Sequence, residues 1–306
     1  STWMKAMRQF TVEASSRTGD RVKFKLYAGG VSGDEKDVVR KIRLGQLHSG
    51  GFTGVGLGEI APEVRILVAP WLFNGSSEID HVYEKFSGEF EKAFESRGFV
   101  LLGWSEVGFV HVFSKTPART IAEMRKLKIW VWEGDPIAES AYKALGIHPI
   151  PLSVTDVNTS LQTGLIDSVY SAPLYAIALQ WHEKTRFIHQ VPVAHACGAV
   201  LLAKKVFDAI APGQREELLR ISRRRLGALN LQTRKDNEAA LDSLQKQGLQ
   251  ITAPASLDDP KVFETAGRAA RRELVGRLYS GEFLTRVEKS LEEFRSRRKS
   301  APAKSR

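Results

Sequence analysis

The hydrophobic positions of this chain change spacing several times, between the three to four residues typical of helices and the two residues typical of strands. The strictest helical spacing predicts one helix ended by Gly98, with apolar positions at Val82, Phe86, Phe90 and Phe94. The clearest alternation of polar and apolar residues lies in 21–27 and predicts a strand. Further strands are predicted over residues 64–69, 99–104, 107–113, 127–131 and 166–170.

Capping signals set the boundaries of the other helices. Ser32 and Glu35 are spaced as a capping box, which opens a helix that Gly45 ends. Asp135 stands before Pro136, so it is the expected N-cap of a helix that begins at the proline. Three more helices are predicted over residues 3–14, 155–163 and 212–248.

This alternation of strands and helices predicts an α/β fold, with parallel sheets that carry helices on both faces. A chain of 306 residues is too long for one small core and suits two lobes. We therefore expect two doubly wound α/β lobes with a central cleft. In such sheets a ligand binds beyond the carboxyl ends of the strands.

Composition limits the class of protein. A hydrophobic content of 42% fits a globular protein, and no apolar run approaches the roughly 18 residues that a membrane span needs. The single Cys197 excludes an internal disulfide and a cysteine-based metal cage. Ser1 is not an initiator methionine and no signal peptide is visible, so we expect a processed or trimmed form.

The formal net charge of +10 is concentrated in arginine-rich helices and at the C-terminus. The helical residues are Arg220, Arg223, Arg224, Arg225, Arg268, Arg271, Arg272 and Arg277. The simplest interpretation is solvated helix faces plus a disordered tail. The alternative is an anionic partner such as a membrane surface or nucleic acid. Nothing in the sequence resembles a basic, aromatic-rich nucleic-acid motif, so we expect no nucleic-acid partner.

Motifs for cofactors and metals are weak. Gly54, Gly56 and Gly58 lack the spacing of a dinucleotide fingerprint, so they indicate a flexible turn whose bare backbone approaches another element or a ligand. No phosphate-binding loop of the Walker type occurs, and we expect no cofactor. The histidines at 182, 189 and 195 are too far apart for a helical metal pair, so we expect no metal site.

Catalytic chemistry is also weakly indicated. His195 and Cys197 would point to one face of a strand, but nothing nearby in the sequence supplies an orienting carboxylate. An enzyme that uses Glu133 or Glu106 as an acid or base stays open as an alternative, and it predicts a carboxylate with a raised pKa deep in the cleft.

Aromatic residues gather where the predicted strands end. They are Trp104, Trp130, Trp132, Tyr170 and Tyr175. Positions 130 and 132 share one face of a strand, because the side-chain period is two. Either these rings belong to the core, or at least two of them line the cleft. The second interpretation makes them candidate ligand-binding residues.

Several segments together resemble the TRAP-transporter solute-binding proteins, the DctP-like periplasmic receptors. They are YAGGVSGDEKDVVRKIRLGQLHSGGFTG from residue 27, VAPWLF from 68, RGFVLLGW from 97, LKI from 127, KALG from 143, and LQTGLID from 161 with the later Pro173. The resemblance covers residues 1 to about 235. It implies two α/β lobes joined by hinge strands and a long helix, a ligand in the cleft between them, and delivery to a membrane partner.

The resemblance also implies boundaries and surroundings. Lobe I is expected over 1–106 plus about 196–230, lobe II over 107–195 plus about 231–295, and a basic disordered tail over 296–306. The expected location is the periplasm. Family members usually begin with a strand before the helix that here opens at Ser1, and that strand is absent from this sequence.

Three polar anchors of the family are replaced in this sequence. The arginine that commonly clamps a carboxylate matches Trp130, a second arginine matches Val110, and a polar residue before Pro173 matches Ala172. A buried carboxylate without a charged partner costs several kcal/mol, whereas an apolar cleft gains about 25 cal/mol per Å² buried. This divergent subgroup is therefore expected to bind an apolar or amphipathic ligand: a lipid, a sterol- or hopanoid-like molecule, or a long-chain acid.

The expected ligand-binding set contains Trp130, Trp132, Trp104, Val110, Ala172, Tyr170, Phe73, Thr53, Tyr175 and Glu133. The expected partners are membrane transporter components or a lipoprotein. One alternative is a receptor for a small organic acid that feeds a TRAP importer, with a clamp restored by Arg65, Arg119 or Arg125. It predicts a guanidinium pointing into the cleft.

Overall fold

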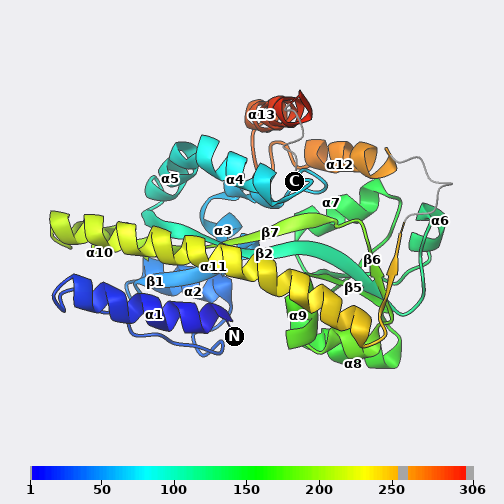
Figure 1. The fold of residues 1–306 in the computed structure, drawn as a ribbon, viewed down its shortest axis with the longest axis horizontal. Coiled ribbons are helices and arrows are strands. Elements are labelled where there is room, and N and C mark those ends of the chain that lie inside the picture. The colour runs from blue at the N-terminus through cyan, green and yellow to red at the C-terminus, as the bar shows by residue number, and fades with distance from the viewer. Residues whose placement is uncertain (1, 254–260, 301–306) are drawn as a thin grey trace.

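A computed structural model describes residues 2–253 and 261–300, and it forms two lobes side by side (Figure 1). The α-helices are α1 (Thr2–Arg17), α2 (Glu35–Arg43), α3 (Gly54–Ile60), α4 (Ser76–Lys85), α5 (Ser87–Glu95), α6 (Ile121–Met124), α7 (Pro136–Ala144), α8 (Val157–Thr163), α9 (Pro173–Ala178), α10 (Lys204–Asp208), α11 (Pro212–Lys246), α12 (Val262–Glu273) and α13 (Gly281–Ser300). Three 3₁₀ helices are η1 (Pro62–Val68), η2 (Val154–Asp156) and η3 (Trp181–Lys184).

A six-stranded sheet runs through both lobes. Its strands are β1 (Ser49–Thr53), β2 (Phe99–Ser114), β5 (Ser168–Ser171), β6 (Phe187–His189), β7 (Ala194–Ala203) and β8 (Gln250–Thr252). A separate two-stranded sheet is formed by β3 (Trp130–Trp132) and β4 (Ile150–Leu152). The sheet order is β1-β7-β2-β6-β8, and β5 also pairs with β2. The pairs β3–β4 and β6–β8 are parallel, as expected, whereas the strands that pass between the lobes are antiparallel.

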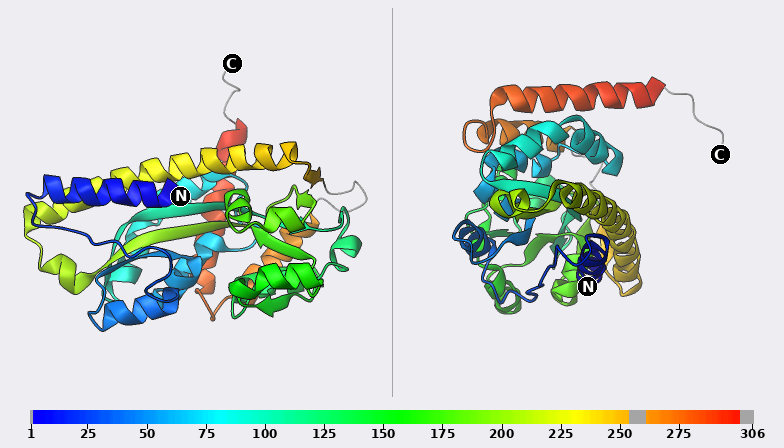
Figure 2. Two further views of the ribbon diagram at one scale, coloured as in Figure 1. Left: turned by 90° about the horizontal axis from the view of Figure 1, so that it is seen from below. Right: turned by 90° about the vertical axis from the view of Figure 1, so that its left-hand side faces the viewer.

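The long strands β2 and β7 cross from one lobe to the other, and α11 lies over them (Figures 1 and 2). Their register shifts between Leu101 and Gly103 and again between Glu106 and Gly108. Gly108 has φ +121°, a left-handed conformation that L side chains rarely adopt. These irregularities bend the ladder where the two lobes meet.

Polar side chains of α11 attach it to the crossing strand. The Ser222 hydroxyl donates to the carbonyl of Leu102 at 2.8 Å, and the Asn237 amide donates to the carbonyl of Val107 at 2.9 Å. Asn230 accepts from the backbone N–H of Glu106 at 2.8 Å. The helix thus satisfies backbone groups of β2 where the ladder is irregular.

Each lobe has its own apolar core. In lobe I, α4, α5 and α13 pack on one side of the sheet through residues such as Phe90, Phe94 and Leu284. On the other side, α1 packs against α11 through residues such as Phe10 and Leu229. Lobe II is built around β3, α7, β5 and α8. We find no helix among the described residues that is long and apolar enough to cross a membrane.

Several predicted element boundaries are confirmed. Asp135 caps α7 by accepting from the backbone N–H of Ile137 at 3.2 Å, and Pro136 takes the first helical position. Gly164 ends α8 in the left-handed conformation, with φ +77°. The long helix runs from Pro212, as the spacing predicts.

Two predicted strands are wrong. Residues 21–27 form no strand, because no described strand lies alongside to complete a ladder of hydrogen bonds. Part of this segment still packs: Phe24 lies 5.2 Å from the ring of Phe10. Residues 64–69 fall largely in the 3₁₀ helix η1. Its run of buried residues, Val64 to Val68, has no alternation, so the pattern alone does not separate strand from helix.

Three further boundaries differ from prediction. Asp34, not Ser32, caps α2, and the Glu35 side chain turns towards β1 and α3 instead of completing a capping box. The helix predicted over 82–94 is divided at Phe86 into α4 and α5. The two strands predicted within 99–113 are one strand, β2, interrupted only by its irregularities.

The predicted disordered tail begins too early. Helix α13 continues through Ser300, so residues 296–300 are helical, while 301–306 lie outside the described residues. The helix lies across the α4 side of lobe I (Figure 2), and Arg295 donates to Glu78 of α4 at 2.7 Å. The expected division placed residues up to 295 in lobe II, but the buried residues of α13 join the lobe I core.

The arginine-rich helix faces carry ion pairs with acidic neighbours. Examples are Arg220 with Glu217, Arg223 with Glu91, Arg225 with Glu13, Arg268 with Glu264 and Arg271 with Glu288. Much of the local positive charge is therefore balanced within the molecule, which favours solvated helix faces over a basic surface that docks an anionic partner.

Candidate functional site

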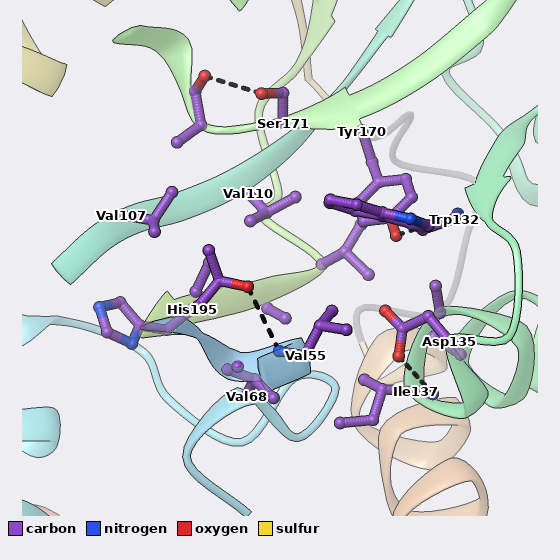
Figure 3. A pocket seen from close by; sticks show the side chains of 18 of the residues that line it. Val55, Val68, Val107, Val110, Trp132, Asp135, Ile137, Tyr170, Ser171 and His195 are labelled. Carbon is purple, nitrogen blue, oxygen red and sulfur yellow. Dashed lines mark hydrogen bonds between the residues drawn. The ribbon is translucent and has the colours of Figure 1, made fainter. Parts of the chain in front are cut away.

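A cavity that is partly open to solvent lies between the lobes (Figure 3). Lobe I contributes the start of α3 and part of η1, and lobe II contributes β3, α7, β5 and α9. The crossing strands β2 and β7 form part of the wall, where Val107 and Val110 lie. Because both lobes and the bent strands contribute, lobe movement would open or close this cavity.

Seven of the ten candidate residues line this cavity. They are Thr53, Val110, Trp130, Trp132, Tyr170, Ala172 and Tyr175. They come from both lobes, so the fold brings together positions that are more than a hundred residues apart. Their contact with a ligand stays a prediction.

The other three candidates lie elsewhere. Trp104 stacks on Tyr83, with ring centroids 4.8 Å apart, against the lobe I core to which α4, α5 and α13 contribute. Phe73 is buried in the same core. Glu133 is exposed beyond β3 and does not line the cavity.

An aromatic cluster around Trp130 forms the lobe II wall. Tyr170 is stacked on Trp130, with centroids 5.2 Å apart and an interplanar angle of 26°. Trp181 meets the Trp130 ring edge-on at 5.2 Å, and Trp132 lies 6.4 Å away. The indole N–H of Trp130 donates to the carbonyl of Leu152 at 3.0 Å, so its polar atom is satisfied within the protein. Trp130 is therefore both a core residue and part of the cavity wall.

One ion pair connects the two lobes across the cavity. Nη2 of Arg65, on η1, donates to Oδ1 of Asp135 at 2.6 Å, and these side chains are only 7% and 12% exposed. Nε of Arg65 is buried and has no partner among the described residues. Arg65 is also the only Lys or Arg among the described residues that line the cavity. A buried guanidinium thus faces the cleft with donor capacity left over.

Glycines of α3 make room for Arg65. A Cβ added at Gly58 would lie 2.9 Å from Cδ of Arg65, and one added at Gly54 would lie 3.9 Å from its Nε. The Gly54–Gly58 run is therefore helical rather than a flexible turn. Its bare backbone does approach another element, as the sequence indicated.

Four polar residues that line the cavity are Arg65, Asp135, Tyr142 and Tyr170. Burial raises the pKa of Tyr170 well above its usual range; nearby Asp135 and Tyr142 raise it further, whereas the charge of Arg65 lowers it. Burial also raises the pKa of Tyr142, and its hydroxyl has no partner among the described residues. Both phenols therefore stay protonated at neutral pH.

Glu35 braces the lobe I side. Its carboxylate accepts from the backbone N–H groups of Thr53 at 2.9 Å and Gly56 at 2.7 Å, and from the Thr53 hydroxyl at 3.0 Å. Burial raises its pKa despite these hydrogen bonds. Burial raises the pKa of Tyr175, and the charge of Glu35 raises it further.

Three candidate catalytic groups, His195, Cys197 and Glu106, are all buried. Nε2 of His195 lies 3.7 Å from Glu106, a carboxylate neighbour that the sequence did not indicate. Burial opposes ionisation of Glu106, but His195 and Arg234 outweigh this effect and hold the pKa of Glu106 below its usual range. The enzyme alternative predicts the opposite, a carboxylate with a raised pKa. Burial raises the pKa of Cys197 to about 12, so its thiol is not a nucleophile at neutral pH. In Figure 3 the His195 ring points away from the open centre.

The other proposed clamp residues lie elsewhere. Arg119 borders a separate small cavity with Trp71 and His189, and Nε of Arg125 donates to the carbonyl of Leu145 at 2.8 Å. Of the three arginines considered from the sequence, only Arg65 reaches the interlobe cavity. No trio of His, Cys, Asp or Glu in the described part of the chain is placed to hold a metal ion.

Comparison with known proteins gives one family. The sequence model of DctP, described as bacterial extracellular solute-binding protein, family 7, matches residues 1–274. The 2,3-diketo-L-gulonate-binding periplasmic protein YiaO of Escherichia coli is 22% identical over 263 residues, which are 85% of this chain and 79% of that protein.

Solved structures of TRAP periplasmic solute-binding proteins share the fold. One from Xanthobacter autotrophicus, with bound β-D-galacturonate, has a TM-score of 0.83 at 21% identity and covers 94% of this chain and 95% of its own. One from Desulfovibrio salexigens, with bound orotic acid, has a TM-score of 0.85 at 18% identity and covers 95% of each chain. The two-lobe fold predicted from the sequence is thereby confirmed.

Proposed function

We propose that this chain, which belongs to the DctP family of bacterial extracellular solute-binding proteins, is a receptor that captures a small organic acid for a TRAP importer. Like other members of its family, it is a periplasmic protein that binds a small ligand and works with membrane transporter components. The family is one of receptors rather than enzymes.

The observation that carries this proposal is the buried guanidinium of Arg65. Of its five N–H donors, one forms a hydrogen bond to a described residue, and the buried Nε has none. A buried donor without a partner costs free energy, and a ligand carboxylate is the group that fits this donor geometry. An acid bound here would therefore satisfy groups that the protein leaves unfilled.

Asp135 gives the site a way to exchange partners. Without ligand, it holds Arg65 from the opposite lobe at 2.6 Å. An incoming carboxylate can take the free donors of Arg65, while Asp135 keeps its hydrogen bond from the N-terminus of α7. The arginine then connects the ligand and both lobes, which favours the closed form.

Known ligands of similar proteins support an acid. The structures compared above hold β-D-galacturonate and orotic acid, and the E. coli relative is named for binding 2,3-diketo-L-gulonate. All three ligands are carboxylic acids. These ligands favour an organic acid over the lipid- or sterol-like ligand that the sequence predicts from the loss of the family arginine. Arg65 removes the reason for that prediction, because it supplies the positive charge from a different element.

A wholly apolar or amphipathic ligand is the second candidate. One observation favours it: most side chains that line the cavity are apolar or aromatic. It leaves the free donors of Arg65 without a partner, however, and so ranks below an acid.

Thermal stability tests the two candidates. The protein is unfolded and refolded to remove any bound ligand, then heated with each member of a panel of small carboxylates. A ligand at 100 times its Kd stabilises the fold by about 2.7 kcal/mol. We expect at least one acid to do so, and uncharged amides of the same acids to fail. If no acid stabilises the protein and organic extraction of the native preparation yields a stoichiometric lipid, the acid proposal is wrong.

A further inference from the structure

We infer, on the basis of the proposed function, that the ligand is a cyclic monocarboxylic acid with few or no hydroxyl groups. This class differs from the polyhydroxylated sugar acid bound by one of the similar structures. The inference depends on three features of the cavity: its single cation among the described lining residues, polar wall side chains that are already hydrogen-bonded within the protein, and its wall of stacked rings.

The charge of the site suits one carboxylate. Arg65 is the only Lys or Arg among the described lining residues, and Asp135 already shares it at 2.6 Å. A ligand with two carboxylates would place a second anion in a largely buried site without a cation of its own. Desolvation and the repulsion by Asp135 both oppose such a dianion.

Three polar side chains of the wall are already engaged within the protein. The Thr53 hydroxyl donates to Glu35 at 3.0 Å, and the Ser171 hydroxyl donates to a neighbouring backbone carbonyl at 3.1 Å. The Trp130 N–H donates to the carbonyl of Leu152 at 3.0 Å. These groups serve the protein's own structure and are not free to receive ligand hydroxyls.

A polyhydroxylated acid would therefore bind poorly. Each hydroxyl carried into the cavity exchanges water for apolar contact, and without a partner it lowers affinity by about ten-fold. The cavity wall also contains Val107, Val110 and Ala172, whose side chains cannot form hydrogen bonds. The cavity thus selects against hydroxyls while it gains from burying ring carbons.

The aromatic wall suits a ring. Trp130 and Tyr170 are nearly parallel, 5.2 Å apart, and both line the cavity. A flat or cyclic body can lie along such a surface with little loss of conformational entropy, whereas an extended chain would lose many rotamers.

Tyr142 provides the second contact for the acid. Tyr142 lines the cavity, and its hydroxyl is buried and has no partner in the described chain. Its ring centroid lies 6.2 Å from that of Tyr170, and Arg65 and Asp135 line the same cavity. We assign the ligand carboxylate to Arg65 Nε and the Tyr142 O–H together, because these two buried donors otherwise stay unfilled.

A matched pair of ring acids tests the inference by isothermal titration of the ligand-free protein. Cyclohexanecarboxylate and quinate share a six-membered ring and one carboxylate, but quinate carries four hydroxyls. We expect cyclohexanecarboxylate to bind at least about 100-fold more tightly than quinate. Benzoate is expected to bind more tightly than the dianion phthalate by a similar factor.

The outcomes separate the inference from the proposed function. If quinate or galacturonate binds more tightly than cyclohexanecarboxylate, the protein is an organic-acid receptor but the inference on ligand class is wrong. If none of these acids nor any other small carboxylate binds, both fail.

The Tyr142→Phe variant tests the second contact. We expect its affinity for cyclohexanecarboxylate to fall about ten-fold with no loss of thermal stability, because the hydroxyl has no partner in the ligand-free fold. Unchanged affinity would overturn the role assigned to Tyr142, and a destabilised variant would show that the hydroxyl serves the fold instead.

Discussion

Replacing Arg65 by glutamine should abolish most carboxylate binding while the protein stays folded. Glutamine keeps a polar side chain but removes the charge and the forked set of donors. A guanidinium and a carboxylate 4 Å apart attract by about 4 kcal/mol at an effective dielectric constant of 20. Measured losses for removing one partner of a buried, hydrogen-bonded pair are about 2–5 kcal/mol, so affinity should fall between about 30-fold and about 5000-fold.

The stability of the variant should change less than its affinity. An uncompensated buried charge costs about 3–5 kcal/mol if it stays buried. Asp135, however, lies on the lobe opposite Arg65 and keeps the hydrogen bond from Ile137 at 3.2 Å, so opening of the lobes returns it to water. We therefore expect a loss of unfolding free energy of about 1 kcal/mol or less, measured by urea denaturation.

Two other variants make this test specific. Arg97→Gln removes a guanidinium from a partly exposed pair with Glu63 at 2.9 Å in the same lobe, and it should leave the affinity unchanged. Asp135→Asn removes the charge that competes for Arg65 and keeps a good N-cap, so it should tighten acid binding about ten-fold. Titration calorimetry measures all three. Near-normal acid binding by a folded Arg65→Gln protein would refute the assignment of the clamp.

Three further predictions concern the surroundings of the site. Gly58→Ala should weaken acid binding about ten-fold in the same titration, because the new Cβ would lie 2.9 Å from Cδ of Arg65 and displace that side chain. The control is Gly227→Ala in α11, which has open space around it and should leave binding unchanged. Burial lowers the pKa of His189 to about 4 from 6.5, so the unfolded chain binds more protons between these values. The free energy of unfolding should therefore fall by about 3 kcal/mol as the pH drops from 6.5 to 4, as measured by urea denaturation. If the His189→Asn variant lost the same amount over this pH range, the prediction would be wrong. Cys197, with a pKa of about 12, should react with iodoacetamide at pH 8 far more slowly in native protein than in urea; equal rates would disprove its burial.

The sequence predicts local structure best where a boundary depends on neighbouring residues. Asp135 and Pro136 at the start of α7, and Gly164 at the end of α8, act within one helical turn. Residues 21–27 alternate like a strand, but a strand depends on a neighbour elsewhere in the chain, and none of the described strands lies beside it. Local pattern carries no information about that neighbour.

The ligand-binding set shows the same limit. Trp104 and Val110 are an even number of residues apart on β2, so alternation places them on one face. The register shift between Glu106 and Gly108 changes the face, and Trp104 joins the lobe I core while Val110 lines the cavity. A bulge of this kind is set by long-range packing and is not visible in the hydrophobic pattern.

The arginine clamp was only partly predictable. The sequence offers Arg65 as one of three alternative clamps, and it predicts Asp135 as a helix cap without indicating its partner. The pair joins residues 70 positions apart, on different lobes. The glycine run did carry a signal, because bare backbone at Gly54 and Gly58 indicated that something approaches it closely, and that neighbour is the Arg65 side chain.

A crystal structure of the protein with cyclohexanecarboxylate tests the central claim most directly. We predict closed lobes, with the carboxylate oxygens about 2.7–3.2 Å from nitrogen atoms of Arg65 and the ring against Trp130 and Tyr170. A carboxylate bound at the rim, with Arg65 still paired only to Asp135, would contradict the account. So would a co-purified lipid that fills the same cavity and leaves the guanidinium without an anion.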